Sequence, residues 1–463
     1  MNPEFLNRRK ENMLFTRSLV KSSRIYVVFI LLFFFFLPCI LHSQARRLLL
    51  DHKTGKSIRY SAEKGDRKVV TVPANIFRKR DEMRGAWVIT AWNLDFPRSR
   101  STAEFQNSYR NLLRELKKAG INTVIFQVRP QCDAFYVSKL NPWSAFLCGG
   151  EGIGIPGFDP MLFMVREAHR QGLSFHAWLN PYRVRGRVPE GKESALKKLA
   201  PLSFARRFPD AVLAVPDGKN FLLMLDPGHP RTTWHLMESV KEILHKYDVD
   251  GIHFDDYFYP YNGIQDVDKH SYLRYCRDRK ISPEAWRRNN VDSMIYNIGA
   301  LVRRHNRLNK KRVKFGVSPF GIWRNRKSDP AGSPTGGLDS YAALFADSRR
   351  WVKENYVDYI VPQLYWSFSD PSAPFACTAD WWAETVKGTK VKLYIGMTLN
   401  KSIPDKPFWE SPEELRNQVL YSSALPQVNG YVFFSARKLL YPDNPLLKKN
   451  VLSLLSLWGG KIK

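Results

Sequence analysis

From residue 84 onward, short apolar runs alternate with longer segments of helical spacing, and this alternation constrains the fold most. Eight apolar runs, rich in β-branched and aromatic residues, cover 84–92, 121–130, 173–182, 250–258, 313–323, 357–366, 391–400 and 428–437. Each is typical of a strand that is buried on both faces of a sheet. Eight helix-like segments lie at 101–120, 159–172, 229–247, 283–306, 338–355, 379–387, 411–424 and 444–457. This alternation predicts an α/β fold, a (β/α)8 or TIM barrel.

The connections favour a closed barrel over an open, doubly wound sheet. No GxGxxG or phosphate-loop motif follows the first predicted strand. The links from helix to strand are tight glycine turns, whereas the link that follows Tyr182 is long and irregular, about fifty residues. In a TIM barrel the loops that follow the strands all lie at the C-terminal face, where active sites form. We therefore expect the functional site at that end.

Residues 1–83 differ in texture from the rest of the chain. Residues 21–45 comprise basic residues, an apolar run from Ile25 to Ile40, and then small and polar residues, which is the layout of a secretory signal. The apolar run of about 16 residues is short for a membrane-spanning helix, which needs roughly 20. We predict a signal peptide over 1–45, a polar and basic linker over 46–83, and a single catalytic domain over 84–457. The expected location is therefore the periplasm or cell envelope.

The chain is strongly basic, with a formal net charge of +29. Such a charge favours anionic polymers or membrane surfaces through long-range attraction. Zinc-finger, helix-turn-helix and RNA-binding signatures are absent from the sequence, so we do not expect a nucleic-acid partner. Electrostatic association with anionic envelope polymers or a membrane surface is the expectation. The sequence also lacks a CxxC pair, which argues against a zinc cluster.

Two adjacent carboxylates end the fourth predicted strand, in the stretch "DGIHFDDYFYPY". Strand alternation places His253 and Asp255 on one face and Asp256 on the other. Glycoside hydrolysis usually requires two carboxyl groups, about 5–5.5 Å apart for retention of configuration and about 6.5–9.5 Å apart for inversion. The partner of Asp255 is therefore Asp256 after a bend in the chain, or an acid at another strand end. Those other candidates are Asp133, Asp95, Glu151 and Asp226.

Amides, arginines and aromatic residues also gather at the predicted strand ends, and this composition suits a hydroxyl-rich ligand such as a glycan. We predict Asp255 as nucleophile or base, with Asp256 or Asp133 as proton donor. The predicted substrate contacts are Arg129, His176, Asn180, Tyr182, His253, Gln363, Tyr365 and Trp366. Structural roles compete with these assignments, because the carboxylates could pair with Arg129 or Arg183 and the histidines could lie in the core.

Six segments resemble a known family: "RGAWVITAWN", "INTVIFQVRPQCDAFY", "HAWLNPYRV", "DGIHFDDYFYP", "VKFGVSPFGIWRN" and "VDYIVPQLYW". Together they are similar to the bacterial glycosyl-hydrolase-like, family-10-like barrels, and the resemblance extends from residue 83 to residue 437. It implies an exported or envelope-associated barrel. We expect no cofactor. One family member acts on peptidoglycan glycan strands stripped of their peptides, which implies a similar substrate here.

The fourth predicted strand is also similar to the nucleophile strand of the α-amylase superfamily, whose pattern is Gly-x-Arg-x-Asp. Gly251 and Asp255 match this pattern, and His253 replaces the arginine. The fifth predicted strand lacks the glutamate that serves as acid/base in that superfamily. Three hypotheses follow: an exported glycoside hydrolase acting on an envelope glycan, a catalytically silent glycan-binding barrel, and a metal-dependent hydrolase. The last would use His253, Asp255, His176 or Asp226.

Overall fold

A computed structural model describes residues 45–61, 63, 65–276 and 280–462. The segment predicted as a signal peptide lies outside these residues, apart from Ala45. Within the described part of the chain, no helix combines the length and the apolar character needed to cross a membrane.

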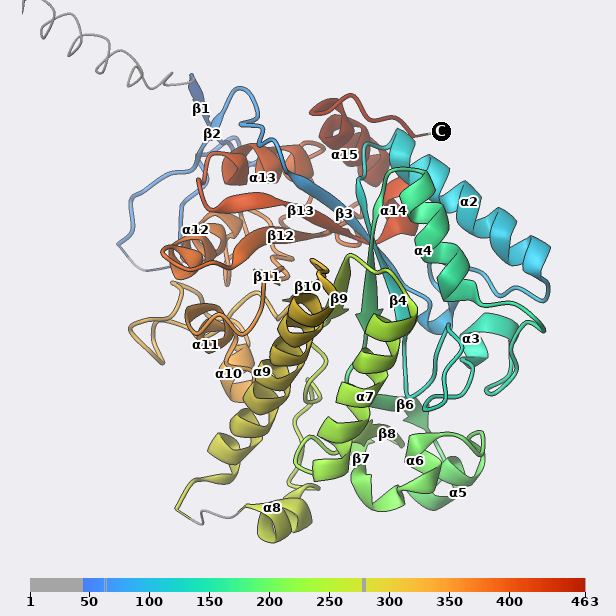
Figure 1. Ribbon diagram of the computed structural model, residues 1–463. Coiled ribbons are helices and arrows are strands. Elements are labelled where there is room, and N and C mark those ends of the chain that lie inside the picture. Colours follow the sequence, from blue (N-terminus) through green and yellow to red (C-terminus); the bar gives the residue numbers. More distant parts are fainter. Residues whose placement is uncertain (1–44, 62, 64, 277–279, 463) are drawn as a thin grey trace, which may run out of the picture. The chain divides into compact units, whose positions relative to one another are not determined.

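Eight parallel strands close into a barrel, which confirms the predicted fold (Figure 1). They are β3 (Met83–Val88), β4 (Thr123–Arg129), β5 (Ser174–Leu179), β9 (Gly251–Phe254), β10 (Lys314–Val317), β11 (Tyr359–Ile360), β12 (Lys392–Thr398) and β13 (Val428–Phe434). Neighbours in the barrel follow chain order, and β13 pairs with β3 to complete the ring. Every predicted strand therefore forms.

The helices pack outside the strands, and their ends follow from local chemistry (Figure 1). Ser101 caps α2 by accepting a hydrogen bond from the amide of Glu104, and Asp159 caps α4 in the same way. The long helices are α2 (Thr102–Lys118), α4 (Pro160–Arg170), α7 (Pro230–Lys246), α9 (Pro283–Asn309), α12 (Phe375–Val386), α13 (Glu414–Ser423) and α15 (Pro445–Ser456). Short helices are α3 (Ala145–Cys148), α5 (Lys192–Lys197), α6 (Phe204–Arg207), α8 (Lys269–Tyr275) and α14 (Ala436–Leu440).

The helix predicted over 338–355 is instead two short helices, α10 (Ser340–Ala343) and α11 (Ser348–Lys353). Phe345 has a positive φ of 49°, which interrupts a right-handed helix. Asp347 then caps α11 by accepting a hydrogen bond from the amide of Arg350. A capping residue inside an apolar periodic stretch is thus the physical reason for the break.

The long segment after β5 was predicted to be irregular. It contains instead a three-stranded antiparallel sheet. Its strands are β6 (Arg183–Val188), β7 (Val212–Asp217) and β8 (Asn220–Leu225), in the order β6-β8-β7. Gly218, with a φ of 61°, makes the tight turn between β7 and β8. This inserted sheet lies where the chain leaves the barrel rim, so it can form a wall beside the site.

Residues 46–82 also differ from the predicted basic linker, because they pack against the barrel domain. Strand β1 (Arg46–Leu48) pairs with β2 (Thr71–Pro73), and β2 packs against α13. Val70 and Val72 are buried in the main core. The Tyr60 hydroxyl donates a hydrogen bond of 2.8 Å to Asp380. The apolar side chains here are too widely spaced to give a periodic signal, but they are enough to dock the segment.

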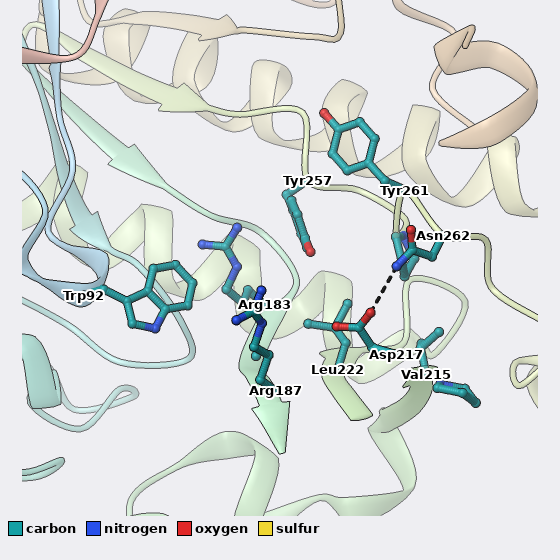
Figure 2. A pocket seen from close by; sticks show the side chains of 12 residues that line it. Trp92, Arg183, Arg187, Val215, Asp217, Leu222, Tyr257, Tyr261 and Asn262 are labelled. Carbon is teal, nitrogen blue, oxygen red and sulfur yellow. Dashed lines mark hydrogen bonds between the residues drawn. The ribbon is translucent and has the colours of Figure 1, made fainter. Parts of the chain in front are cut away.

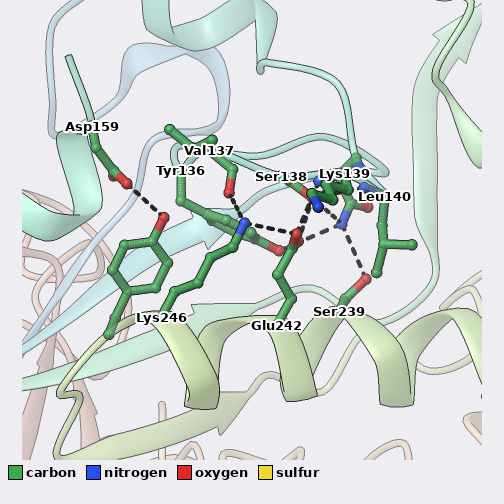
Figure 3. A network of polar contacts seen from close by, with 11 residues as sticks. Tyr136, Val137, Ser138, Lys139, Leu140, Asp159, Ser239, Glu242 and Lys246 are labelled. Carbon is green, nitrogen blue, oxygen red and sulfur yellow. Dashed lines mark hydrogen bonds and ion pairs between the residues drawn. The ribbon is translucent and has the colours of Figure 1, made fainter. Parts of the chain in front are cut away.

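The loop after β4 is fixed to α7 by a polar network (Figure 3). Glu242 accepts hydrogen bonds from the Ser138 hydroxyl, the Lys139 amide and the Lys246 ammonium group, at 2.5, 2.9 and 2.9 Å. Asn141 donates to Ser239 at 3.0 Å. These contacts hold one of the loops at the C-terminal face in place. Cys132, Cys148 and Cys377 are free thiols.

Candidate active site

A cavity of about 190 Å³ opens at the C-terminal ends of the barrel strands, at the end predicted from the loop lengths. We call it the catalytic cleft. Its lining includes both adjacent carboxylates, with aromatic and amide side chains from several strand ends: Trp87, Gln127, Trp178, Asp255, Asp256, Tyr257, Ser318, Gln363 and Tyr365. Asp255 and Asp256 follow β9 directly, and each is 8% exposed. The chain bends after Phe254, so both carboxyl groups reach one cavity although strand alternation alone would separate them.

Asp255 is held as a hydrogen-bond acceptor. Its Oδ2 accepts from the indole Nε1 of Trp178 at 3.1 Å and from the Asn180 amide at 2.9 Å. Its Oδ1 accepts from the backbone amide of Tyr257 at 3.3 Å. Burial raises the pKa of Asp255, while the charge of Arg183 and these hydrogen bonds oppose the rise. The three donors fix the orientation of the carboxylate and favour its ionised form.

Asp256 is held differently, and its pKa is raised to about 7. Burial is the main cause, and the neighbouring charge of Asp255 adds to it, whereas a hydrogen bond from Gln363 opposes the rise. The Tyr261 hydroxyl also donates to Oδ2 of Asp256. At neutral pH Asp256 therefore retains a proton in a large fraction of molecules. One cavity thus contains an oriented acceptor and a proton donor.

The two histidines predicted to contact substrate lie inside the barrel, among the strands. His176 and His253 are both almost fully buried, and each shares a hydrogen bond with the Tyr359 hydroxyl, at 2.8 and 3.1 Å. Nε2 of His253 accepts from the indole of Trp87 at 3.1 Å. Burial lowers both pKa values, that of His176 to about 4, so both rings are neutral. They form a polar layer among the strands and do not line the catalytic cleft.

Arg129 and Asn180 support Asp255 from behind. Arg129 is fully buried, and its guanidinium donates to the carbonyl of Asn180 at 2.7 Å and to Oδ1 of Asn141 at 3.3 Å. Asn180 in turn donates to Asp255. Both residues were predicted to hold sugar, but the structure makes them positioning residues because their polar atoms are already engaged. Tyr182, also predicted as a sugar contact, is fully buried beside Phe258.

Asp133 and Trp366 likewise lie away from the lining of the catalytic cleft. Asp133 is buried, accepts from the Gln131 amide at 3.0 Å and interacts electrostatically with Glu151. Burial raises its pKa to about 6. Trp366 packs edge-on against Phe320. Of the predicted sugar contacts, Gln363 and Tyr365 are the two that reach the cavity.

The four residues considered as metal ligands are not gathered together. Asp226 accepts hydrogen bonds from Ser271 and the Gly228 amide, in a separate buried cluster near α8. Within the residues that the structure describes, no group of three or more His, Cys, Asp or Glu side chains is arranged to hold a metal ion.

A larger hollow of about 510 Å³ continues from the catalytic cleft toward the inserted sheet (Figure 2). We call it the outer cleft. Trp92, Arg183 and Tyr257 line both hollows. The far wall of the outer cleft includes Asp217, which accepts a hydrogen bond of 3.1 Å from Asn262. From the sequence, Arg183 was expected only as a possible structural partner of the carboxylates, and Trp92 had no individual role. Arg187 and the wall itself were missed because the inserted sheet was not foreseen.

A third hollow adjoins the other side of the catalytic cleft. It shares Ile89, Leu94 and Phe434 with the catalytic cleft and extends toward Arg437 and Lys438. Asp95 lies here and accepts hydrogen bonds from the Ser435 hydroxyl at 2.6 Å and the Arg437 amide at 3.2 Å. The three hollows together run across the C-terminal face, with the two carboxyl groups in the middle one.

Comparison with known proteins places the chain in a family. The model of the glycosyl hydrolase-like 10 family matches residues 82–411. Glycosyl hydrolase YngK of Bacillus subtilis (strain 168) is 38% identical over 392 residues, which cover 83% of this chain and 74% of that protein. Glycosyl hydrolase DigH of Escherichia coli (strain K12) is 37% identical over 408 residues, covering 84% and 90% of the two chains.

Among solved structures, α-L-fucosidase isoenzyme 2 from Paenibacillus thiaminolyticus aligns with a TM-score of 0.46 and 13% identity, covering 81% of this chain and 49% of its own. An α-amylase from Malbranchea cinnamomea aligns with a TM-score of 0.42 and 13% identity, covering 81% and 73%. The family match and the two relatives agree with the resemblance of the strand-end motifs. The chain belongs to the glycosyl hydrolase-like 10 family.

Proposed function

We propose that this protein is an exported glycoside hydrolase that cleaves an envelope glycan, namely the glycan strands of peptidoglycan, by carboxylate acid/base chemistry. The observation that carries the proposal is the pair Asp255 and Asp256 in one cavity, with Asp255 oriented by three hydrogen bonds and the pKa of Asp256 raised to about 7. Two carboxyl groups with separated proton affinities are the usual equipment for glycoside hydrolysis. Membership of the glycosyl hydrolase-like 10 family, and the printed names of both relatives, support the same reaction class.

The surroundings of each carboxyl group support a different role. Asp256 retains its proton near neutral pH and donates it to the oxygen of the glycosidic bond as that bond breaks. Asp255, oriented by Trp178 and Asn180, acts as the nucleophile or as the base for water at the anomeric carbon. The fifth barrel strand, β10, is followed at the cavity by Ser318 and not by a glutamate. Asp256 therefore supplies the acid that a glutamate at this strand supplies in the α-amylase superfamily.

The form of the site supports a polymeric substrate. Hollows adjoin the catalytic cleft on both sides, so a chain of sugars could lie across the C-terminal face with an internal bond at the carboxyl groups. The aromatic residues Trp92, Tyr257 and Tyr365 offer flat apolar faces with polar edges, which suit sugar rings. The net charge of +29 would favour an anionic polymer of the envelope or an association with a membrane surface.

The decisive experiment is digestion of purified peptidoglycan glycan strands, with and without attached peptides, followed by mass analysis of the fragments. We expect the wild-type protein to release fragments and Asp255→Asn to lose at least about 100-fold of that activity. Asp248→Asn is the matched control, because Asp248 precedes the same strand at the opposite end of the barrel and 66% of its side chain is exposed.

Two outcomes would contradict the proposal. If Asp255→Asn, with its fold verified by circular dichroism, cleaves the strands as fast as wild type, Asp255 has no catalytic role. If wild type binds the strands but leaves them intact under all conditions, the barrel is a glycan-binding protein without catalysis.

A further inference from the structure

Trp92 presents an exposed aromatic face at the boundary between the catalytic cleft and the outer cleft. Its side chain lines both hollows and is 57% exposed. Its φ of 53° lies in the left-handed region, which bulky residues rarely adopt and which is often found at functional sites. The next residue, Asn93, donates hydrogen bonds to the carbonyls of Phe96 and Phe146, at 3.1 and 2.7 Å. The fold therefore holds the indole ring in the cleft instead of burying it.

Two arginines of β6 face the same space (Figure 2). The guanidinium of Arg183 lies 5.6 Å from the ring centre of Trp92 and 4.3 Å from that of Tyr257. Arg187 is exposed and, like Trp92, has a positive φ, of 51°. The arginine ion pairs found in the described part of the chain are made by other arginines. The charge of Arg187 is therefore available to a ligand, while that of Arg183 faces the ligand and also acts on Asp255.

The outer cleft contains one lining carboxylate, and it is already engaged. Asp217 accepts a hydrogen bond from Asn262 across the far end of the cleft, away from Trp92 (Figure 2). The wall between them is apolar at Val215 and Leu222. The outer cleft thus combines an aromatic platform and an apolar wall with two guanidinium groups that make no ion pair within the described residues, which together match a sugar ring that carries a negative charge.

We propose that Trp92, Arg183 and Arg187 form a subsite, adjoining the carboxyl pair, that holds a carboxylate-bearing sugar ring of the glycan. The sugar ring stacks on the indole, and its carboxylate lies between the two guanidinium groups. This subsite rests on the proposed function, because it supplies binding energy to a strand that is cleaved at Asp255 and Asp256. Its own role is to hold the strand, so it acts on affinity and on the choice of substrate.

The first test measures equilibrium binding in an Asp255→Asn background, where the glycan remains intact. The probe is peptide-free peptidoglycan glycan strands of defined length. Adding Trp92→Ala should weaken binding about ten-fold. Adding Trp92→Phe in its place should keep most of the parent's affinity, because the phenyl ring still offers a flat apolar face. Trp234→Ala is the matched control, since Trp234 is 53% exposed on the outer helix α7 and should leave binding unchanged.

The second test asks whether the subsite recognises charge. The same strands are compared before and after chemical reduction of their carboxyl groups to alcohols. Arg187→Gln should weaken binding of the acidic strands about five-fold and leave binding of the reduced strands unchanged. The control Arg304→Gln removes the same charge from the exposed surface of α9 and should alter neither.

The subsite is overturned if the Asp255→Asn protein does not bind the acidic strands, or if Trp92→Ala binds as tightly as its parent. It is also overturned if Arg187→Gln weakens binding of acidic and reduced strands equally. Failure of the proposed function is distinguished from these outcomes by activity. If the wild-type protein cleaves no glycan, the proposed hydrolase activity is wrong. The binding measurements then still show whether the proposed subsite exists.

Discussion

Asp255 and Asp256 differ in the interactions that raise or lower the pKa of each carboxyl group. Both carboxyl groups are buried to the same degree, but Asp255 accepts three hydrogen bonds whereas Asp256 also experiences the negative charge of Asp255. Each unit of pKa difference corresponds to about 1.4 kcal/mol between protonation states. Burial together with the negative charge of Asp255 therefore keeps the proton on Asp256, while the hydrogen bonds to Asp255 favour its ionised form.

Asp256→Asn should reduce cleavage of the glycan by about 100- to 10,000-fold, because it removes the proton donor to the leaving group. On an oligosaccharide with a dinitrophenyl leaving group, which departs without protonation, the variant should retain most of its activity. The ratio of kcat/KM for the two substrates, in wild type and variant, measures this difference. Equal losses on both substrates would show that Asp256 does not act as the acid.

The dependence of kcat/KM on pH should report the titration of the proton on Asp256. Catalysis needs Asp256 protonated, so kcat/KM should fall as the pH rises through about 7. Gln363→Met removes a hydrogen bond to the ionised form of Asp256, which raises its pKa and moves the basic limb to higher pH. Gln106→Met on α2, outside the barrel, is the control and should keep the wild-type limb. A limb that stays in place, or moves down, in Gln363→Met would contradict the assignment.

At the residue scale, four of the residues predicted for the site line the cavity, whereas several of their predicted neighbours do not: the four are Asp255, Asp256, Gln363 and Tyr365. Strand alternation gives the face of a side chain but not its depth along the barrel. His253 shares the face of Asp255 but comes two residues earlier, about 6.6 Å lower in the strand. That distance moves it from the cavity into the layer shared with Tyr359. Depth depends on strand tilt and register, which a single sequence does not reveal.

At the element scale, the eight barrel strands were predictable because each is a continuous apolar run. Strand β7 and its partner β8 are also apolar, but they lie inside a segment that was taken as one long loop. The turn "DGKN" between them is a recognisable hairpin signal, because Asp-Gly favours the positive φ found at Gly218. Strands β1 and β2 carry no such signal, since each has three residues.

The packing of residues 46–82 can be tested through one buried side chain. Val72 of β2 is 0% exposed, so Val72→Ala should lower the free energy of unfolding by about 2 kcal/mol. Val69→Ala, at a position 39% exposed, removes the same atoms and should have little effect. Urea unfolding of both variants measures the difference. Equal stability of the two variants would mean that this segment does not pack on the barrel in solution.

At the scale of the whole molecule, positive charge and cleft geometry act together. The hollows run across one face, and Arg183 and Arg187 line the outer cleft. In the third hollow, Arg437 and Lys438 are balanced by Asp95 and Asp443, and Lys438 pairs with Asp443. The net charge of +29 extends the attraction beyond contact distance. The carboxyl groups lie beside the basic outer cleft, so an anionic strand would be attracted toward the site before any specific contact forms.

This attraction predicts that kcat/KM depends on salt concentration only when the substrate carries negative charge. The screening length in solution falls from about 10 Å at 0.1 M salt to about 3 Å at 1 M, so attraction to an acidic glycan should weaken steadily over that range. We expect kcat/KM on peptide-free glycan strands to fall with added salt, and kcat/KM on carboxyl-reduced strands to stay nearly constant. Initial rates on both substrates between 0.02 and 1 M sodium chloride measure the two slopes. Parallel slopes would show that salt acts on the protein or its chemistry, and that the basic charge does not attract the substrate.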